Sequence, residues 1–145
     1  MSFPKLLVCL LCSLVLAAPA WAAGRQTKGS KPLSISQGSE VALTDFLVTG
    51  KTTVFDFTSV YCPPCRAYAE PLLALHQQRG DLAVVKVDIN RQEYHHIDWE
   101  SPVARQYALS GQGLPHFKIY GPDGKLVVEG PEARALVNRW LSELK

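Results

Sequence analysis

The sequence has almost no excess of charge, few cysteines and no internal repeat. Its 15 basic side chains are balanced by 13 acidic ones, for a net charge of +2, so bulk electrostatics gives no case for nucleic-acid binding. Four cysteines in 145 residues are too few for a small secreted domain built on a disulfide framework. The composition of the chain, with 47% apolar and 19% charged residues, is typical of one globular domain with a buried core.

An apolar run near the amino terminus predicts a signal peptide. A short positive start precedes an almost unbroken apolar run over residues 6–18, which small residues follow. The run has 13 residues, whereas a membrane-spanning helix needs roughly 20; an uncleaved anchor is the alternative. We expect a signal peptide at 1–22, cleaved after Ala22, and a periplasmic protein. A flexible leader at 23–32 and one domain at 33–145 would follow.

Cleavage would divide the cysteines into two pairs. Cys9 and Cys12 lie inside the apolar run and would leave with the signal peptide. The mature chain would keep only Cys62 and Cys65, so its cysteine chemistry depends on that one pair.

Hydrophobic patterning predicts an α/β domain with a parallel half and an antiparallel half. In chain order we expect a possible helix start at 44–45, a strand at 52–58, a helix at 63–79, a strand at 82–89, a loop at 90–100, a short helix at 101–109, strands at 115–120 and 125–129, and a helix at 131–144. Strand, helix and strand in succession predict parallel pairing, and the turn at 121–124 predicts a hairpin. The result is a central mixed sheet, with a βαβ half and a ββα half and helices on both faces.

The segment Cys62-Pro63-Pro64-Cys65 lies between a buried strand and the start of a helix, which is typical of a redox-active cysteine pair. The first turn of a helix has unpaired N–H groups and a partial positive charge, and both stabilise a thiolate. We expect Cys62, exposed at the helix start, to be the attacking thiol. Cys65, one turn further on, would resolve the mixed disulfide that thiol–disulfide exchange requires.

Three other interpretations of the pair remain open. A purely structural disulfide would close so short a loop that it removes little unfolded-state entropy. A zinc site would need two more ligands, and a copper carrier would combine both thiolates with an imidazole. The candidate additional ligands are His76, His95, His96 and His116.

The chain resembles the thioredoxin-fold family over residues 41–144. The resemblance rests on Val54-Phe55-Asp56-Phe57 and the cysteine motif, Lys86-Val87-Asp88, the Gly113-Leu114-Pro115 turn, and the final hairpin and helix. It is nearest to the secreted bacterial branch of thioredoxin-like thiol–disulfide oxidoreductases, which includes TlpA-like reductases. It implies the thioredoxin fold and a redox-active disulfide between Cys62 and Cys65.

The resemblance also implies roles for two charged side chains. Asp56 matches the buried acid that takes and returns the proton of the resolving cysteine, and burial should raise its pKa towards neutrality. Lys86 matches the lysine near that acid. The alternatives are an Asp56–Lys86 pair that is structural only and a lysine on the surface.

Pro115 matches the family's cis-proline, which faces the cysteine pair. Together with Leu114 it would form a docking edge for the backbone of a substrate peptide. The ring of Tyr61 would provide a flat apolar surface before the first cysteine. An ordinary trans proline is the alternative. His116 would either face Cys62 and stabilise its thiolate or point to solvent.

The sequence departs from the family's usual pattern in two places that bear on function. Pro63 removes an N–H that could stabilise the Cys62 thiolate, which favours a more reducing protein. The segment at 90–100 is an insertion that contains Tyr94, His95, His96 and Trp99. It could form a partner-specific lip or bind a metal, although a solvated loop with one anchoring aromatic residue is the favoured interpretation.

The sequence therefore predicts a monomeric protein disulfide oxidoreductase without a cofactor, with a reductase favoured over the alternatives, an oxidant or an isomerase. Its partners would be protein thiols and disulfides and a membrane electron donor. A copper carrier that uses Cys62, Cys65 and His95 or His116 is the competing hypothesis.

Overall fold

The computed structural model describes residues 30–144. The signal peptide expected at 1–22, and the expected leader as far as residue 29, lie outside the described residues. Within them, no helix combines the length and the apolar character needed to cross a membrane.

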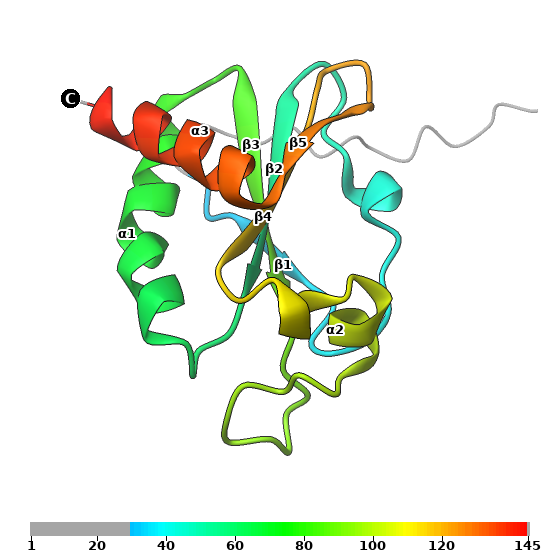
Figure 1. Ribbon diagram of the computed structural model, residues 1–145. Helices are drawn as coiled ribbons and strands as arrows, with labels where there is room; N and C mark the ends of the chain where they lie inside the picture. The colour runs from blue at the N-terminus through cyan, green and yellow to red at the C-terminus, as the bar shows by residue number, and fades with distance from the viewer. Residues whose placement is uncertain (1–29, 145) are drawn as a thin grey trace, which may run out of the picture.

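The described chain forms a five-stranded sheet with helices around it (Figure 1). The strands are β1 (Leu33–Ile35), β2 (Thr52–Thr58), β3 (Leu82–Asp88), β4 (His116–Tyr120) and β5 (Leu126–Glu129). The helices are α1 (Pro63–Gln78), α2 (Pro102–Gln106) and α3 (Gly130–Ser142), with 3₁₀ turns at Leu43–Phe46 and Leu109–Gly111.

The sheet is mixed, with the order β1-β3-β2-β4-β5. β3 runs parallel to both β1 and β2, whereas β4 is antiparallel to β2 and to β5. The two inner parallel strands are almost completely buried, as nearly continuous apolar runs require when both faces of a sheet are covered. The expected βαβ and ββα halves are therefore confirmed.

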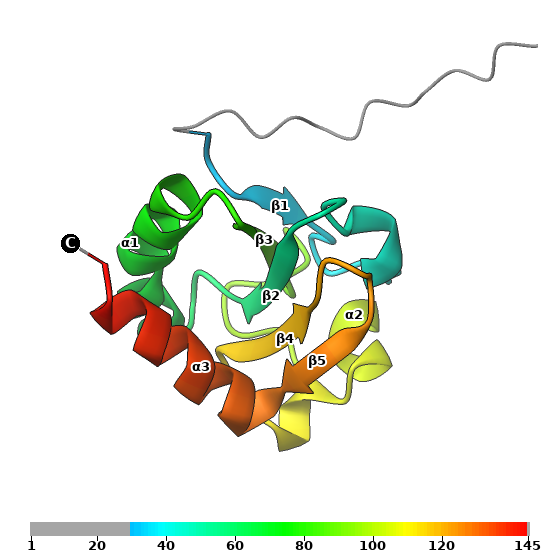
Figure 2. The ribbon, with the colours of Figure 1, turned by 90° about the horizontal axis from the view of Figure 1, so that it is seen from above.

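Side-chain alternation along β2 divides the core between the two faces of the sheet. Val54 packs under α1 and α3 in one cluster, with Leu72, Leu75 and Val137. Phe55 and Phe57 point to the other face, where α2 and both 3₁₀ turns cover them. Figure 2 shows α1 and α3 on one side of the strands and α2 on the other. Helices cover both faces, as predicted.

Some boundaries differ from the prediction, for local reasons. The short helix ends at Gln106 rather than near residue 109, and Ala108 adopts a left-handed conformation with φ 51° before a separate 3₁₀ turn. The expected helix after Thr44 is only a 3₁₀ turn. β1 was not predicted as a strand, because three residues with two exposed side chains give no clear alternation.

Candidate functional site

The two cysteines of the predicted motif form a disulfide at the start of α1, just beyond the carboxyl end of β2. Cys62 is the N-cap residue of α1, and its Sγ accepts a hydrogen bond from the Cys65 N–H at 3.2 Å. The turn before it is closed by the Cys62 N–H, which donates to the Ser59 carbonyl. The disulfide therefore spans the first turn of a helix, as the spacing predicts.

The expected exposure of Cys62 is wrong for this oxidised form. Cys62 is 2% exposed and Cys65 3% exposed. As the N-cap residue, Cys62 has an extended backbone with its sulfur turned in over the first turn of α1, where it bonds to Cys65. Access to the Cys62 sulfur therefore depends on the groups around the disulfide.

The two prolines limit the donors that reach Cys62. An N-cap side chain accepts from the N–H of the second or third helical residue, and here these are Pro64, which has no N–H, and Cys65. Pro63 is the first helical residue, whose N–H would not be one of these donors. The missing donor is thus at Pro64, rather than at Pro63 as the sequence alone indicated.

Asp56 lies on β2 and is almost completely buried, at 2% exposure. Alternation places its side chain on the face covered by α1, the helix that carries Cys65. Its Oδ1 is buried and has no hydrogen-bond partner among residues 30–144. Burial raises the pKa of this carboxyl from 3.8 to about 7, and the charge of Lys86 opposes the rise. A carboxyl poised near neutrality is suited to accept and return a proton.

Lys86 lies beside Asp56 in the parallel register of β2 and β3. None of the ion pairs found within residues 30–144 joins these two side chains, so a purely structural pair has no support. Lys86 and Cys65 instead both line an open cavity of about 350 Å³, together with Arg66 and Asp88. This cavity gives solvent a route to the resolving cysteine.

The Leu114–Pro115 peptide bond is cis, as the resemblance implies. Pro115 is buried and immediately precedes β4. Its carbonyl accepts a hydrogen bond from Arg134 of α3, and Leu114 packs against the core on the α2 side of the sheet. The turn is therefore held from both faces of the sheet.

His116 takes neither of its two expected positions. It pairs with Phe57 across β2 and β4, and its ring lies edge-on to the Phe57 ring with centroids 5.7 Å apart. This is the opposite face of the sheet from Asp56, and the residue is only 2% exposed. Burial lowers the pKa of His116 and so disfavours a positive charge on its ring. Its side chain is not a solvent-exposed docking group.

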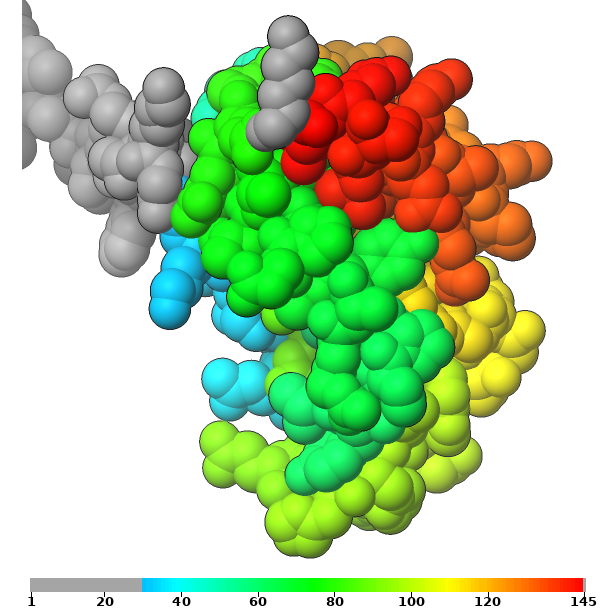
Figure 3. Space-filling model, turned by 90° about the vertical axis from the view of Figure 1, so that its left-hand side faces the viewer, coloured from blue at the N-terminus to red at the C-terminus, as the bar shows by residue number. Residues whose placement is uncertain are grey.

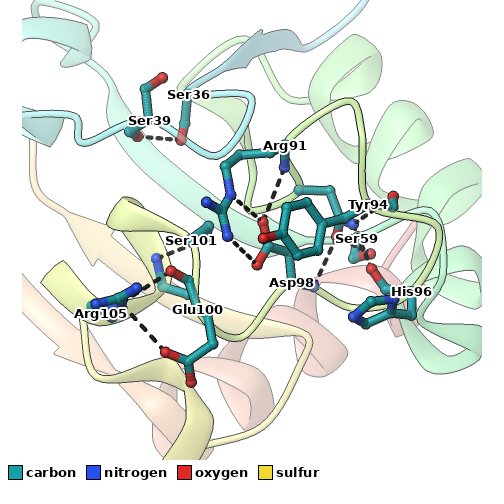
Figure 4. A network of polar contacts seen from close by, with 12 residues as sticks. Ser36, Ser39, Ser59, Arg91, Tyr94, His96, Asp98, Glu100, Ser101 and Arg105 are labelled. Atoms are coloured by element: carbon teal, nitrogen blue, oxygen red, sulfur yellow. Dashed lines mark hydrogen bonds and ion pairs between the residues drawn. The ribbon is translucent and has the colours of Figure 1, made fainter.

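A buried polar network supports the segment before Cys62, and no sequence pattern indicates it. Ser59 Oγ accepts from the Tyr61 N–H at 3.1 Å and donates to Asn90 Oδ1 at 2.6 Å. Asn90 Nδ2 donates to the His96 carbonyl at 2.6 Å. Ser59 and Asn90 are 31 positions apart, and neither residue type identifies such a contact in advance. Figure 4 shows this network from close by.

The insertion after β3 is folded against the redox segment. The Tyr61 hydroxyl lies 3.3 Å from His95 Nδ1, and the two rings are nearly perpendicular. His96 lies against Tyr94, so the two adjacent histidines have different neighbours. Among residues 30–144, no three histidine, cysteine or acidic side chains are grouped so that they could hold a metal ion.

Comparison with known proteins connects this geometry to thioredoxins. No family model matches the sequence. The H-type thioredoxins of Brassica campestris and Brassica oleracea are each 32% identical to it over 78 residues, which is 54% of this chain. The chain spans about half of the length of these curated relatives, 55% in each case.

Solved structures of thioredoxins share the architecture. Thioredoxin from Trypanosoma brucei brucei superposes with a TM-score of 0.53 and 23% identity, over 82% of this chain and 94% of that one. Mitochondrial thioredoxin 3 from Saccharomyces cerevisiae, in its oxidised form, gives a TM-score of 0.50 and 26% identity, over 78% and 95% of the two chains. The chain has the thioredoxin fold.

Proposed function

We propose that this protein is a thiol–disulfide oxidoreductase that reduces disulfides in other proteins through Cys62 and Cys65. The observation that carries the proposal is the disulfide at the start of α1, on the same side of the sheet as a buried, unpartnered Asp56 whose pKa is about 7. The cis bond at Pro115 and the similarity to thioredoxins support it.

The proposed reaction consumes the reduced protein. The Cys62 thiolate attacks one sulfur of the partner's disulfide, and the other partner sulfur leaves as a thiolate. Asp56 accepts the proton of Cys65 through water, and the Cys65 sulfur attacks Cys62. The second partner sulfur then leaves, and Cys62 and Cys65 are oxidised by two electrons in total. The backbone of Leu114, in the docking edge that it forms with Pro115, would hold the partner segment by strand addition.

Two features favour reduction over oxidation as the direction of electron flow. With Pro64 in the second helical position, the Cys65 N–H is the sole donor of the first turn to Cys62 Sγ. His116 lies on the other face of the sheet, and burial lowers its pKa, which disfavours a positive charge there. A thiolate that is weakly stabilised makes the reduced form a better electron donor. A membrane electron donor would recharge it.

The compartment is part of the proposal. Residues 1–22 have the sequence pattern of a signal peptide, so we propose that the mature protein works in the periplasm. The full chain can be expressed in a Gram-negative host and recovered from its periplasm. Sequencing of the amino terminus of the recovered protein should then begin at residue 23. Retention of the intact chain in the membrane fraction would indicate an uncleaved anchor instead.

Insulin reduction tests the activity. The protein, kept reduced by dithiothreitol, should accelerate precipitation of the insulin B chain. Cys62→Ser should abolish the acceleration, and Cys65→Ser should trap a mixed disulfide through Cys62. If the native protein is inert but binds Cu(I) tightly at 1:1, the copper carrier replaces the proposal. A reduction potential near −270 mV supports a reductant, and one near −120 mV an oxidant.

A further inference from the structure

The insertion after β3 is a preformed element rather than a loose loop. Asp98 is 1% exposed and accepts two hydrogen bonds from the Arg91 guanidinium, at 2.7 and 3.0 Å. The same guanidinium lies over the ring of Tyr94, 4.2 Å from its centroid. Figure 4 shows Arg91 beside Asp98 and Tyr94. We call the segment from Asn90 to Asp98 the lip.

The lip and the redox segment form one hydrogen-bonded unit. Asn90 connects the lip to Ser59, and Ser59 holds the backbone of both Tyr61 and Cys62. On the outer side, His95 contacts the Tyr61 hydroxyl. Because the lip is fixed at both points, it occupies a set place beside the disulfide before any partner arrives.

A groove of about 290 Å³ separates the lip from the redox segment. Its lining residues include Gln37, Val60, Tyr61, Asp88, Arg91 and Gln92. It shares Ser34, Val60 and Asp88 with the cavity that reaches Cys65. In Figure 3 the segment around β1, the start of α1 and the lip meet around a hollow on this face. The groove therefore adjoins the cavity that reaches the redox site.

The groups in the groove fit a neutral polypeptide. Its one cationic lining group is already paired, since Arg91 bonds to Asp98, and one carboxylate oxygen of Asp88 accepts from the Asn90 N–H. The side-chain amides of Gln37 and Gln92 make no hydrogen bond to any residue that the structure describes, and amides pair with peptide groups as both donors and acceptors. Val60 is 63% exposed and Tyr61 37% exposed, so the wall is open to an apolar side chain.

We propose that this groove binds an extended, uncharged segment of the partner protein next to its disulfide, so that the lip selects protein disulfides over small ones. The inference rests on the proposed function for its role in turnover. Binding of the segment itself does not depend on redox chemistry, and the two can be tested separately.

Binding is measured with the oxidised protein and a neutral peptide in which serines replace both cysteines. We expect NMR shifts confined to the groove, and a loss of at least fivefold in affinity for the double variant Gln37→Asn/Gln92→Ala. Asparagine is chosen at position 37 because the backbone there has φ 50°, which asparagine tolerates. Gln78→Ala, at the far end of α1, is the matched control and should bind like the native protein. Shifts elsewhere, or a charged peptide that binds more tightly, would overturn the inference.

Turnover is measured with the disulfide form of the same peptide and with hydroxyethyl disulfide. The ratio of the two kcat/KM values should fall about tenfold in the double variant, through KM for the peptide. An unchanged ratio in active variants means that the groove does not select partners. If the native protein binds the serine peptide but reduces neither disulfide, peptide binding in the groove is supported and the proposed function is wrong.

Discussion

Asp56 is the residue whose surroundings say most about the chemistry. A carboxyl with a buried, unpartnered oxygen and a pKa of about 7 reduces stability when it ionises, because desolvation opposes the charge. Structural acids are instead paired, as Asp98 is with Arg91. This contrast within one chain supports a proton-transfer role for Asp56.

Asp56→Asn should slow resolution of the mixed disulfide about 10- to 100-fold at pH 7, because general-base contributions are of order 10²–10⁴ and water can partly replace the carboxyl. Stopped-flow measurements give the rate of mixed-disulfide resolution as a function of pH. The native protein should show a change in this rate near pH 7, and Asp56→Asn should not. Asp45→Asn, on an exposed 3₁₀ turn, is the control. A native-like pH profile in Asp56→Asn would remove the proposed role.

Residues are predictable where one motif fixes their place. Cys62, Cys65, Asp56 and Pro115 fall where the resemblance puts them, because each position is tied to a strand end or a helix start. His116 was not predictable in the same way. Alternation fixes which face of a strand a residue takes only once the register with β2 is known, and that register pairs it with Phe57.

At the scale of elements, the first turn of α1 determines which N–H groups reach the Cys62 sulfur. Pro64→Ala should add a second N–H for the Cys62 thiolate. Hydrogen bonds to charged groups contribute about 1.5–3 kcal/mol, so we expect the Cys62 pKa to fall by roughly one unit and the potential to become more oxidising. Thiolate absorbance at 240 nm against pH measures the first change. Pro63→Ala is the matched control. An equal fall of the Cys62 pKa in that variant would contradict the conclusion that the missing donor is at position 64.

The start of α2 makes a separate prediction about stability. Ser101 is fully buried, and its Oγ accepts from the Ala104 N–H at 3.2 Å. Ser101→Ala should reduce the free energy of unfolding by about 1 kcal/mol, as loss of an N-cap does. Urea denaturation measures this. Ser110→Ala, at an exposed position, should change it by less than about 0.5 kcal/mol.

The elements themselves follow from periodicity, whereas the lip does not. The sequence predicts both ends of β2 correctly. A continuous apolar, β-branched run is typical of a strand that is buried on both faces of a sheet. The lip has no periodic pattern, and contacts across the sequence, such as Ser59 with Asn90, hold it together. Sequence reasoning could locate this insertion but could not tell a solvated loop from a fixed one.

At the scale of the whole molecule, the sheet separates two cores and places Asp56 at the edge of one of them. The core under α1 and α3 is apolar around Val54, and Asp56 follows on the same face of β2. Ionisation of Asp56 therefore changes the free energy of unfolding of the entire fold rather than of a local segment. Global unfolding can report its ionisation.

Linkage gives the sign of this dependence. The folded-state pKa of Asp56 is raised from 3.8 to about 7, so the folded protein binds the proton more tightly than the unfolded chain, and stability is lost as pH rises between these values. At about 1.4 kcal/mol for each pKa unit, the loss reaches roughly 4 kcal/mol above pH 7. The lowered pKa values of His76 and His116 act in the opposite direction, since they cost stability as pH falls below about 6.5.

The difference between Asp56→Asn and the native protein isolates the aspartate, because both chains share the two histidines. We expect the variant to gain stability relative to the native protein progressively from pH 4 to pH 7 and to keep a constant advantage above it. Urea unfolding of the oxidised proteins at closely spaced pH values measures the difference, and Asp45→Asn should show no such trend. A difference independent of pH would mean that Asp56 is already ionised in the fold at pH 4, and its place as a proton acceptor near neutrality would be lost.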